Sequence, residues 1–171
     1  LVDKFEITLN EEAADILIIN TCSFIESAKQ ESIDTILEAV KYKSKNLKVL
    51  VVTGCLSKRY GKELFEEIPE IDILLGVMNY DNILKYIEDF IKTGKRIIDN
   101  ENKENIIFES NRILTTPKHY AYLKISEGCN NNCTFCIIPK IRGRHVSRNI
   151  ESLVNEGKFL AEQGIKELIL I

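Results

Sequence analysis

The sequence lacks any apolar run long enough to cross a membrane. Its longest uninterrupted apolar stretches, such as 16–19 and 49–52, are far shorter than the ~20 residues that a membrane-spanning helix needs. A secretory signal is also missing, because the first residues show no basic segment followed by an apolar stretch and a cleavage-like site. We therefore expect a cytoplasmic protein with no membrane partner.

Dense clusters of one charge are missing as well. The 171 residues include 23 Lys and Arg against 26 Asp and Glu, which gives a net charge of −3. No basic run reaches the density of a dedicated nucleic-acid-binding domain, so a nucleic-acid partner is not expected for this chain. With 44% apolar and 29% charged residues, the composition is that of a folded globular protein and excludes disorder, collagen and a disulfide-stabilised miniprotein.

The five cysteines are an odd number, and three of them lie within eight residues. This distribution suits a reducing compartment and metal binding better than a disulfide framework. The two ends of the sequence suggest truncation. The start has no initiator Met, and the end, 168–171, is an apolar run typical of a strand that needs neighbours.

The hydrophobic pattern predicts an α/β fold. Short apolar strands at 16–19, 49–52 and 71–75 are each followed by a stretch with helical spacing of apolar residues. Parallel strands need crossover helices, so three such units predict a parallel sheet in a first domain, which we assign to residues 1–95. The polar range 96–119 is predicted to be a linker.

Residues 120–171 are predicted to open a second α/β domain with a β-loop-α-β unit. A strand at 120–125 is followed by a cysteine-rich loop, a helix and a strand at 167–171. Helical spacing predicts that four apolar side chains of this helix point inward: Ile150, Leu153, Val154 and Leu160.

The strongest motif is the Cys-x3-Cys-x2-Cys array of Cys129, Cys133 and Cys136, directly after the predicted strand 120–125. Three thiolates on one tight loop can hold three irons of a 4Fe–4S cluster and leave the fourth iron open to a small molecule. Gly128 provides backbone freedom where the loop begins, and Phe135 is expected to shield the cluster from water.

Two other readings of this array stay open at this point. The three cysteines could share the loop by coincidence, as small buried side chains. Alternatively, His145 could complete a zinc site, although structural zinc uses four ligands and the spacing is not that of a usual zinc finger.

The wider segment resembles the radical S-adenosylmethionine superfamily, and specifically its methylthiotransferase branch. The resemblance is carried by 125–129, 137–139, Arg142-Gly143 and 146–148. It implies that the open iron binds the amino and carboxylate groups of S-adenosylmethionine and that the cluster cleaves the sulfonium reductively. The resulting 5′-deoxyadenosyl radical would abstract hydrogen, and the electron would come from a donor such as flavodoxin or ferredoxin.

Cys22 and Cys55 each follow a predicted strand of the first domain. The carboxyl ends of parallel strands meet at the edge where open α/β sheets bind ligands. A single cysteine is more often a small buried hydrophobic residue, but two at equivalent strand ends indicate ligands. The resemblance implies an auxiliary 4Fe–4S cluster held by three cysteines in this domain. The first of those would lie upstream of this chain, so the cluster is not expected to bind here normally.

Within that family, 23–33 and 54–61 are similar to the enzymes that modify a ribosomal protein. The implied substrate is an aspartate of a small-subunit ribosomal protein, which is converted to 3-methylthioaspartate. One S-adenosylmethionine would donate the methyl group and another the radical, and the auxiliary cluster would carry the sulfur. The implied architecture is an amino-terminal methylthiotransferase domain followed by the first part of a partial TIM-type barrel.

Two alternatives to this function remain. One is a methylthiotransferase that acts on adenosine in tRNA, and the other is a non-catalytic metal module for electron transfer or zinc binding. In either enzymatic case we do not expect this 171-residue stretch to complete the reaction alone.

A cluster of cations follows the cysteine loop: Lys140, Arg142, Arg144, His145 and Arg148. Arginine grips carboxylates through two parallel hydrogen bonds, so the three arginines are candidates to bind the cofactor carboxylate or an acidic substrate. Phe135 is a further candidate for cofactor binding. A solvated loop is the alternative, and no residue is assigned as catalytic.

Overall fold

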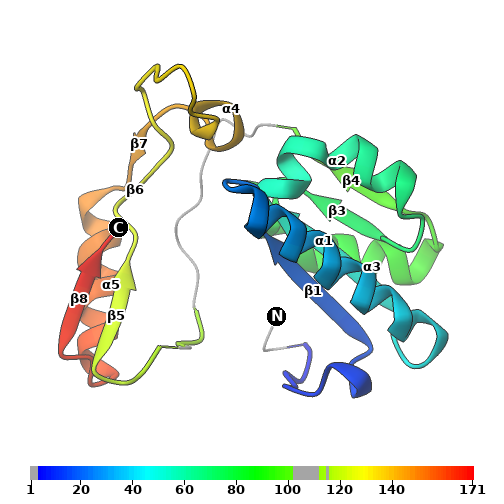
Figure 1. The fold of residues 1–171 in the computed structure, drawn as a ribbon. Helices are drawn as coiled ribbons and strands as arrows, with labels where there is room; N and C mark the ends of the chain where they lie inside the picture. Colours follow the sequence, from blue (N-terminus) through cyan, green and yellow to red (C-terminus); the bar gives the residue numbers. More distant parts are fainter. Residues whose placement is uncertain (1–3, 102–111, 115) are drawn as a thin grey trace. The chain divides into compact units, whose positions relative to one another are not determined.

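A computed structural model describes residues 4–101, 112–114 and 116–171 (Figure 1). The chain divides into two compact units, Leu1–Glu104 and Asn105–Ile171. No helix within the described ranges is both long and apolar enough to span a membrane.

The first unit is an α/β structure around a parallel sheet with the strand order β1-β2-β3-β4. Its strands are β1 (Ile16–Thr21), β2 (Val49–Gly54), β3 (Ile73–Leu75) and β4 (Ile97–Asp99). Its α-helices are α1 (Glu26–Val40), α2 (Cys55–Glu67) and α3 (Ile83–Thr93). Three short 3-10 helices complete the unit: Glu11–Ala13, Lys41–Ser44 and Tyr80–Asn82. The predicted α/β class with a parallel sheet is thus confirmed.

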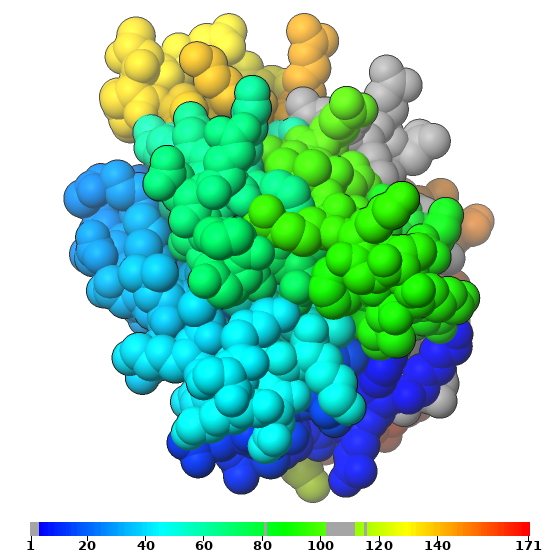
Figure 2. Space-filling model, turned by 90° about the vertical axis from the view of Figure 1, so that its right-hand side faces the viewer, coloured from blue at the N-terminus to red at the C-terminus, as the bar shows by residue number. Residues whose placement is uncertain are grey.

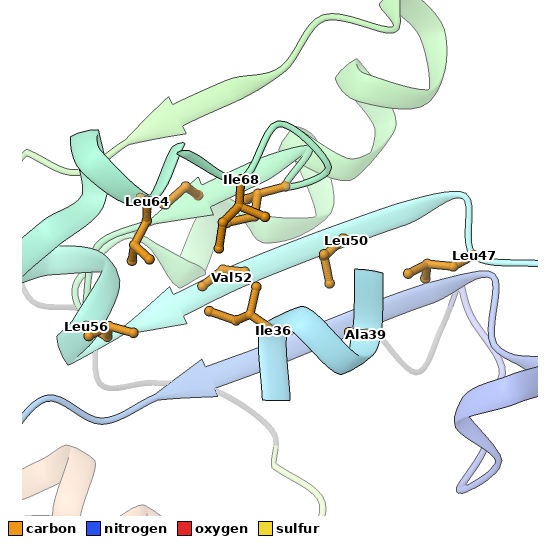
Figure 3. Close-up of a cluster of buried hydrophobic side chains, with 10 residues drawn as sticks. Ile36, Ala39, Leu47, Leu50, Val52, Leu56, Leu64 and Ile68 are labelled. Carbon is orange, nitrogen blue, oxygen red and sulfur yellow. The ribbon is translucent and has the colours of Figure 1, made fainter. Parts of the chain in front are cut away.

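Helices cover both faces of this sheet, and β2 explains why. Leu50 and Val52 pack with residues of α1 and α2 on one face (Figure 3). Val49 and Val51 pack with residues of α3 on the other face. All four side chains are fully buried, so the strand reads as an unbroken apolar run rather than an alternating one. In the space-filling view, residues coloured cyan to green pack closely together on one face of the first unit (Figure 2).

Strand β4 lies inside the range 96–119, for which a linker was predicted. Ile97 pairs with Ile73 of β3, and the Ile97 N–H donates to the carbonyl of Asp72 at 2.8 Å. A run of three residues within a polar segment is too short to show the alternation that predicts a strand. These residues form a strand because they pair with β3, and a sequence pattern does not show that pairing. Residues 102–111 and 115 of the predicted linker lie outside the described residues.

The second unit contains the predicted β-loop-α-β unit. Its strands β5 (Tyr120–Leu123) and β8 (Glu167–Leu170) pair in parallel, and α5 (Ile150–Glu162) connects them. The loop between β5 and α5 contains β6 (Ser126–Glu127), α4 (Ile138–Arg142) and β7 (Val146–Ser147). A partial barrel beyond this unit stays a prediction.

Helix α5 buries less of its apolar face than the sequence predicts. Leu160 is fully buried and Leu153 is half-buried, but Ile150 is 77% exposed and Val154 is 47% exposed. The prediction that Ile150 and Val154 point into the core is therefore wrong for this chain. Among the described residues, the sheet that pairs β5 with β8 has two strands, and two strands cover a narrow stripe of a helix.

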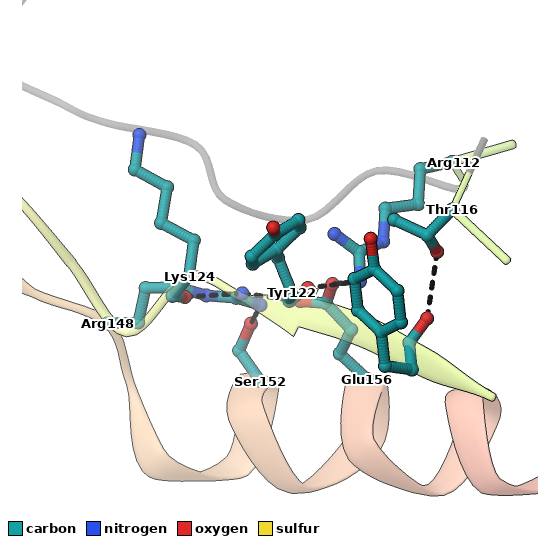
Figure 4. Close-up of polar contacts among 8 residues, drawn as sticks. Arg112, Thr116, Tyr122, Lys124, Arg148, Ser152 and Glu156 are labelled. Carbon is teal, nitrogen blue, oxygen red and sulfur yellow. Dashed lines mark hydrogen bonds and ion pairs between the residues drawn. The ribbon is translucent and has the colours of Figure 1, made fainter. Parts of the chain in front are cut away.

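Arg148 joins the elements of the second unit (Figure 4). Its guanidinium donates to the carbonyl of Lys124 at 2.9 Å and to Oγ of Ser152 at 2.8 Å, and it pairs with Glu156. The other carboxylate oxygen of Glu156 lies 3.3 Å from Arg112, which belongs to the predicted linker. The carboxyl end of that range therefore packs on the second unit.

Candidate metal centres

The first candidate site lies at the carboxyl edge of the parallel sheet. Thr21, the last residue of β1, pairs in register with Gly54, the last residue of β2. Cys22 and Cys55 follow these partners directly, so the two strands deliver both cysteines to one edge. Their predicted placement at equivalent strand ends is confirmed, whereas their role as ligands stays a prediction.

Gly54 allows the two strands to approach closely at this edge. Its φ of +104° is unfavourable for other residues, and a Cβ atom there would lie 2.4 Å from the carbonyl oxygen of Thr21. The hydroxyl of Thr21 donates to the carbonyl of Thr53 at 2.6 Å. The ends of β1 and β2, which the two cysteines follow, are thus held together by a close backbone approach and a side-chain hydrogen bond.

Ser32 of α1 holds the backbone of Cys22. The Cys22 N–H donates to Oγ of Ser32 at 3.0 Å, and that hydroxyl lies 2.8 Å from the carbonyl of Ala28, to which it can donate. The Cys22 side chain is exposed, and Cys55, the first residue of α2, is half-buried. The part of Ser32 could not be predicted from the sequence, because a serine inside a helix gives no pattern that connects it to a neighbouring strand end.

Three further polar side chains at this edge are buried without a hydrogen-bond partner among the described residues. They are Ser23 at 2% exposure, Thr53 at 7% and Asn79 at 1%. Buried polar groups are nearly always hydrogen-bonded, so these three are suited to a polar ligand at the edge. The sulfur atoms of an iron–sulfur cluster accept such hydrogen bonds, and two cysteine thiolates are ligands that such a cluster prefers. The residues present therefore fit an iron–sulfur cluster, although Cys22 and Cys55 are only part of a ligand set.

The second candidate site is the loop that contains the other three cysteines. Strands β6 and β7 pair in antiparallel fashion at its base, where Glu127 lies opposite Val146. The Cys129 N–H donates to the carbonyl of Gly143 at 3.1 Å. Gly128 has a φ of +75°, and a Cβ atom there would lie 2.2 Å from the carbonyl oxygen of Arg144. The predicted need for glycine at this position is confirmed.

The thiols of this loop are accessible. Cys129 and Cys136 are half-buried, Cys133 is exposed, and the N–H of Asn131 donates to the sulfur of Cys129 at 3.4 Å. No three Cys, His or acidic side chains of the described residues lie close enough together to hold a metal ion. The donor set of three thiols on one eight-residue loop nevertheless fits the three protein ligands of an open 4Fe–4S cluster.

Two further predictions about this loop lack structural support. Phe135 is 91% exposed, and its expected role in shielding a cluster stays a prediction. His145, the proposed fourth zinc ligand, is exposed, and its backbone N–H donates to the side chain of Asn130 at 3.1 Å. The described residues contain no preformed zinc site.

Glu127 is the buried centre of the charges around the loop. It is 5% exposed, pairs with Lys124, and accepts from Arg142 at 3.0 and 3.1 Å. Burial raises the pKa of Glu127, but the hydrogen bonds and charges of Lys124 and Arg142 outweigh burial, so this pKa lies below its ordinary value.

The three candidate arginines have different surroundings. Arg142 lies against Glu127, Arg148 is buried among the residues of β5 and α5, and Arg144 is exposed. The geometry therefore gives Arg148 a structural part, which sequence analysis missed, because the partners of Arg148 come from distant positions along the chain. Cofactor binding by any of the three stays a prediction.

Two protein families match this chain. Residues 2–76 match the uncharacterized protein family UPF0004, and residues 123–171 match the radical SAM superfamily. The first match contains Cys22 and Cys55, and the second contains the loop with Cys129, Cys133 and Cys136.

Curated relatives are similar to the chain over nearly its whole length. The ribosomal protein uS12 methylthiotransferase RimO of Clostridium novyi is 58% identical over 171 residues, which is 100% of this chain and 38% of the relative. The proteins of the same description from Clostridium botulinum (strain Eklund 17B) and Clostridium tetani are 57% and 53% identical, over 99% and 96% of the chain. The chain spans 37–38% of the length of these relatives.

Proposed function

We propose that this chain is part of a radical S-adenosylmethionine methylthiotransferase and that the whole protein inserts a methylthio group into ribosomal protein uS12. The bond would form at the β-carbon of an aspartate side chain. The observation that carries this proposal is the identity of 53–58% to uS12 methylthiotransferases, which extends through both units of the chain. Both candidate metal centres lie within that stretch.

The loop with Cys129, Cys133 and Cys136 would hold the radical 4Fe–4S cluster through three thiolates. When bound, this cluster supplies the electron that cleaves S-adenosylmethionine. The chain's own contribution is to present the thiols on a short loop whose base β6 and β7 close. Glu127 adds to this by tying Arg142, the last residue of α4, to β6.

Cys22 and Cys55 would provide two ligands to the auxiliary 4Fe–4S cluster. Their strands place them on one sheet edge, and Gly54 brings β1 and β2 into close approach there. Ser32 fixes the backbone at Cys22, so one of the two ligands is oriented before any metal binds. A preoriented ligand loses less conformational entropy on binding.

The partners and the location follow from the same proposal. The protein substrate is a small-subunit ribosomal protein, the electron donor is of the flavodoxin or ferredoxin type, and the site of action is the cytoplasm. The reducing environment there keeps all five cysteines free of disulfides, as they are in the structure.

Mass spectrometry of a deletion strain tests the substrate. We expect uS12 from the strain to lose the mass of one methylthio group at an aspartate, while methylthio-adenosine in tRNA stays at the wild-type level. Complementation with the wild-type gene is the positive control, and complementation with a Cys133→Ala gene should fail. Loss of the tRNA modification alone would overturn the proposal in favour of a tRNA methylthiotransferase. If neither modification changes, the alternative of a non-catalytic metal module gains support.

A further inference from the structure

We propose that Ser23, Thr53 and Asn79 donate hydrogen bonds to sulfur atoms of the cluster held by Cys22 and Cys55. This inference rests on the proposed function, because it assumes an iron–sulfur cluster at the sheet edge. It assigns these residues as positioning residues that stabilise the cluster and set its reduction potential.

The three residues come from successive strand ends of one parallel sheet. Ser23 follows Cys22 directly, and Thr53 precedes the Gly54-Cys55 pair. Asn79 lies in the turn after β3, where its N–H donates to the carbonyl of Gly76 at 3.1 Å. The strands β1, β2 and β3 run parallel (Figure 1), and parallel strands gather their carboxyl ends at one edge. Since each of the three residues follows or ends one of these strands, all three belong to the edge that carries the two cysteines.

The lack of partners is not shared by other hydroxyls at this edge. The hydroxyl of Thr21 donates to the carbonyl of Thr53 at 2.6 Å. The hydroxyl of Ser57 lies 2.6 Å from the carbonyl of Leu75 and 2.8 Å from that of Gly54. The hydroxyls of Thr21 and Ser57 thus have backbone carbonyls as hydrogen-bond acceptors. Ser23, Thr53 and Asn79 have no such partner among the described residues, although each is at least 93% buried.

A cluster matches the chemistry of these three groups. Serine and threonine hydroxyls and the asparagine amide are hydrogen-bond donors, and the sulfur atoms around iron are acceptors. Both Oδ1 and Nδ2 of Asn79 are buried without a partner among the described residues, and Nδ2 is the atom of the two that can donate. Hydrogen bonds to cluster sulfur are among the factors that set reduction potential.

The test uses the full-length protein, which includes the expected upstream third ligand, with Cys129, Cys133 and Cys136 replaced by Ala, so that bound iron reports on the auxiliary cluster alone. Thr53→Val, Ser23→Ala and Asn79→Leu are made in this background and reconstituted anaerobically with iron and sulfide. The matched control is Thr35→Val, which removes an exposed hydroxyl that donates to the carbonyl of Glu31 at 2.8 Å. Iron and sulfide content, the rate of iron loss to a chelator and the reduction potential are measured.

We expect Thr53→Val, Ser23→Ala and Asn79→Leu each to lose iron to the chelator about tenfold faster than the parent and to show a lower reduction potential. Thr53→Ser, which keeps the hydroxyl, should return both values toward those of the parent, and Thr35→Val should change neither. The Thr53→Ser comparison distinguishes a lost hydrogen bond from a disturbed fold.

Two results would overturn the inference, and they are distinguishable. If the variants keep the chelator resistance and the potential of an iron-loaded parent, the donors do not face the cluster, and the proposed function is unaffected. If the parent itself binds no iron and sulfide, both this inference and the auxiliary cluster of the proposed function fail.

Discussion

The Nη1 atom of Arg142 lies 3.0 and 3.1 Å from the two carboxylate oxygens of Glu127, a residue that is buried two positions before Cys129. This ion pair ties the end of α4 to β6. Since the three cysteines of the loop lie between these two elements, the pair joins the two ends of the cysteine loop, together with the Cys129–Gly143 backbone hydrogen bond.

Replacement of Glu127 by Gln should destabilise the second unit. We expect Glu127→Gln to lower its free energy of unfolding by about 2 kcal/mol, because Arg142 and Lys124 lose a charged acceptor. Urea unfolding followed by circular dichroism measures the change. The exposed Glu162→Gln is the control, expected to stay within about 0.5 kcal/mol of wild type. Equal effects of the two substitutions would contradict the assigned role.

Gly54 and Gly94 provide a matched pair for backbone strain. Both have positive φ, but a Cβ atom at Gly54 would lie 2.4 Å from the Thr21 carbonyl oxygen, whereas nothing lies within 4 Å at Gly94. We expect Gly94→Ala to lower the free energy of unfolding by about 1 kcal/mol and Gly54→Ala by at least ~2 kcal/mol. Thermal denaturation compares them. A Gly54→Ala variant as stable as Gly94→Ala would refute the close approach of β1 and β2.

Substitution of the buried Arg148 should lower the free energy of unfolding much more than substitution of the exposed Arg144. We expect Arg148→Lys to lower the free energy of unfolding of the second unit by about 3 kcal/mol, because a lysine cannot reproduce the bonds to Lys124, Ser152 and Glu156. Arg144→Lys should stay within about 0.5 kcal/mol of wild type. Denaturant unfolding gives both values, and binding of S-adenosylmethionine to the reconstituted Arg144→Lys protein tests its predicted cofactor contact. A stable Arg148→Lys protein would show that the buried bonds contribute little.

Tyr86 should make the first unit sensitive to alkaline pH. Burial, together with a 2.5 Å hydrogen bond to Asp99 and the charge of that residue, raises the pKa of Tyr86 from 10.0 to about 12. A pKa raised in the folded state means that its contribution to stability is complete below pH 10 and is lost as pH rises toward 12. Unfolding should therefore become easier over that range in wild type, and less so in Tyr86→Phe. Absorbance of tyrosinate measures the ionisation, and identical alkaline profiles would contradict the shift.

Cys133→Ala should remove the iron of the radical site only. We expect anaerobically reconstituted wild type to contain about four more irons per chain than Cys133→Ala, and to show an electron paramagnetic resonance signal that changes with S-adenosylmethionine. Cys55→Ala, the control, should keep that change. Uptake of one zinc by a colourless wild-type protein would instead support a structural metal domain.

Local patterns were sufficient to predict most elements of the fold. The buried strand β2 and the helices α1 and α3 follow from apolar runs and helical spacing that depend on neighbouring residues alone. Strand β4 was missed because three residues acquire strand structure only through pairing with β3. Ile150 and Val154 were misplaced because helical spacing identifies an apolar face without showing what covers it.

The sequence by itself determined which reactive groups this protein has. The number of cysteines and their spacing along the chain are fixed by the covalent structure. Tertiary structure decided what surrounds them. Residues distant in the chain meet in the register of Thr21 with Gly54 and in the ion pair of Arg142 with Glu127. Such residues also bury Ser23, Thr53 and Asn79. Burial and hydrogen bonding depend on neighbours in space, and only the folded chain provides those neighbours.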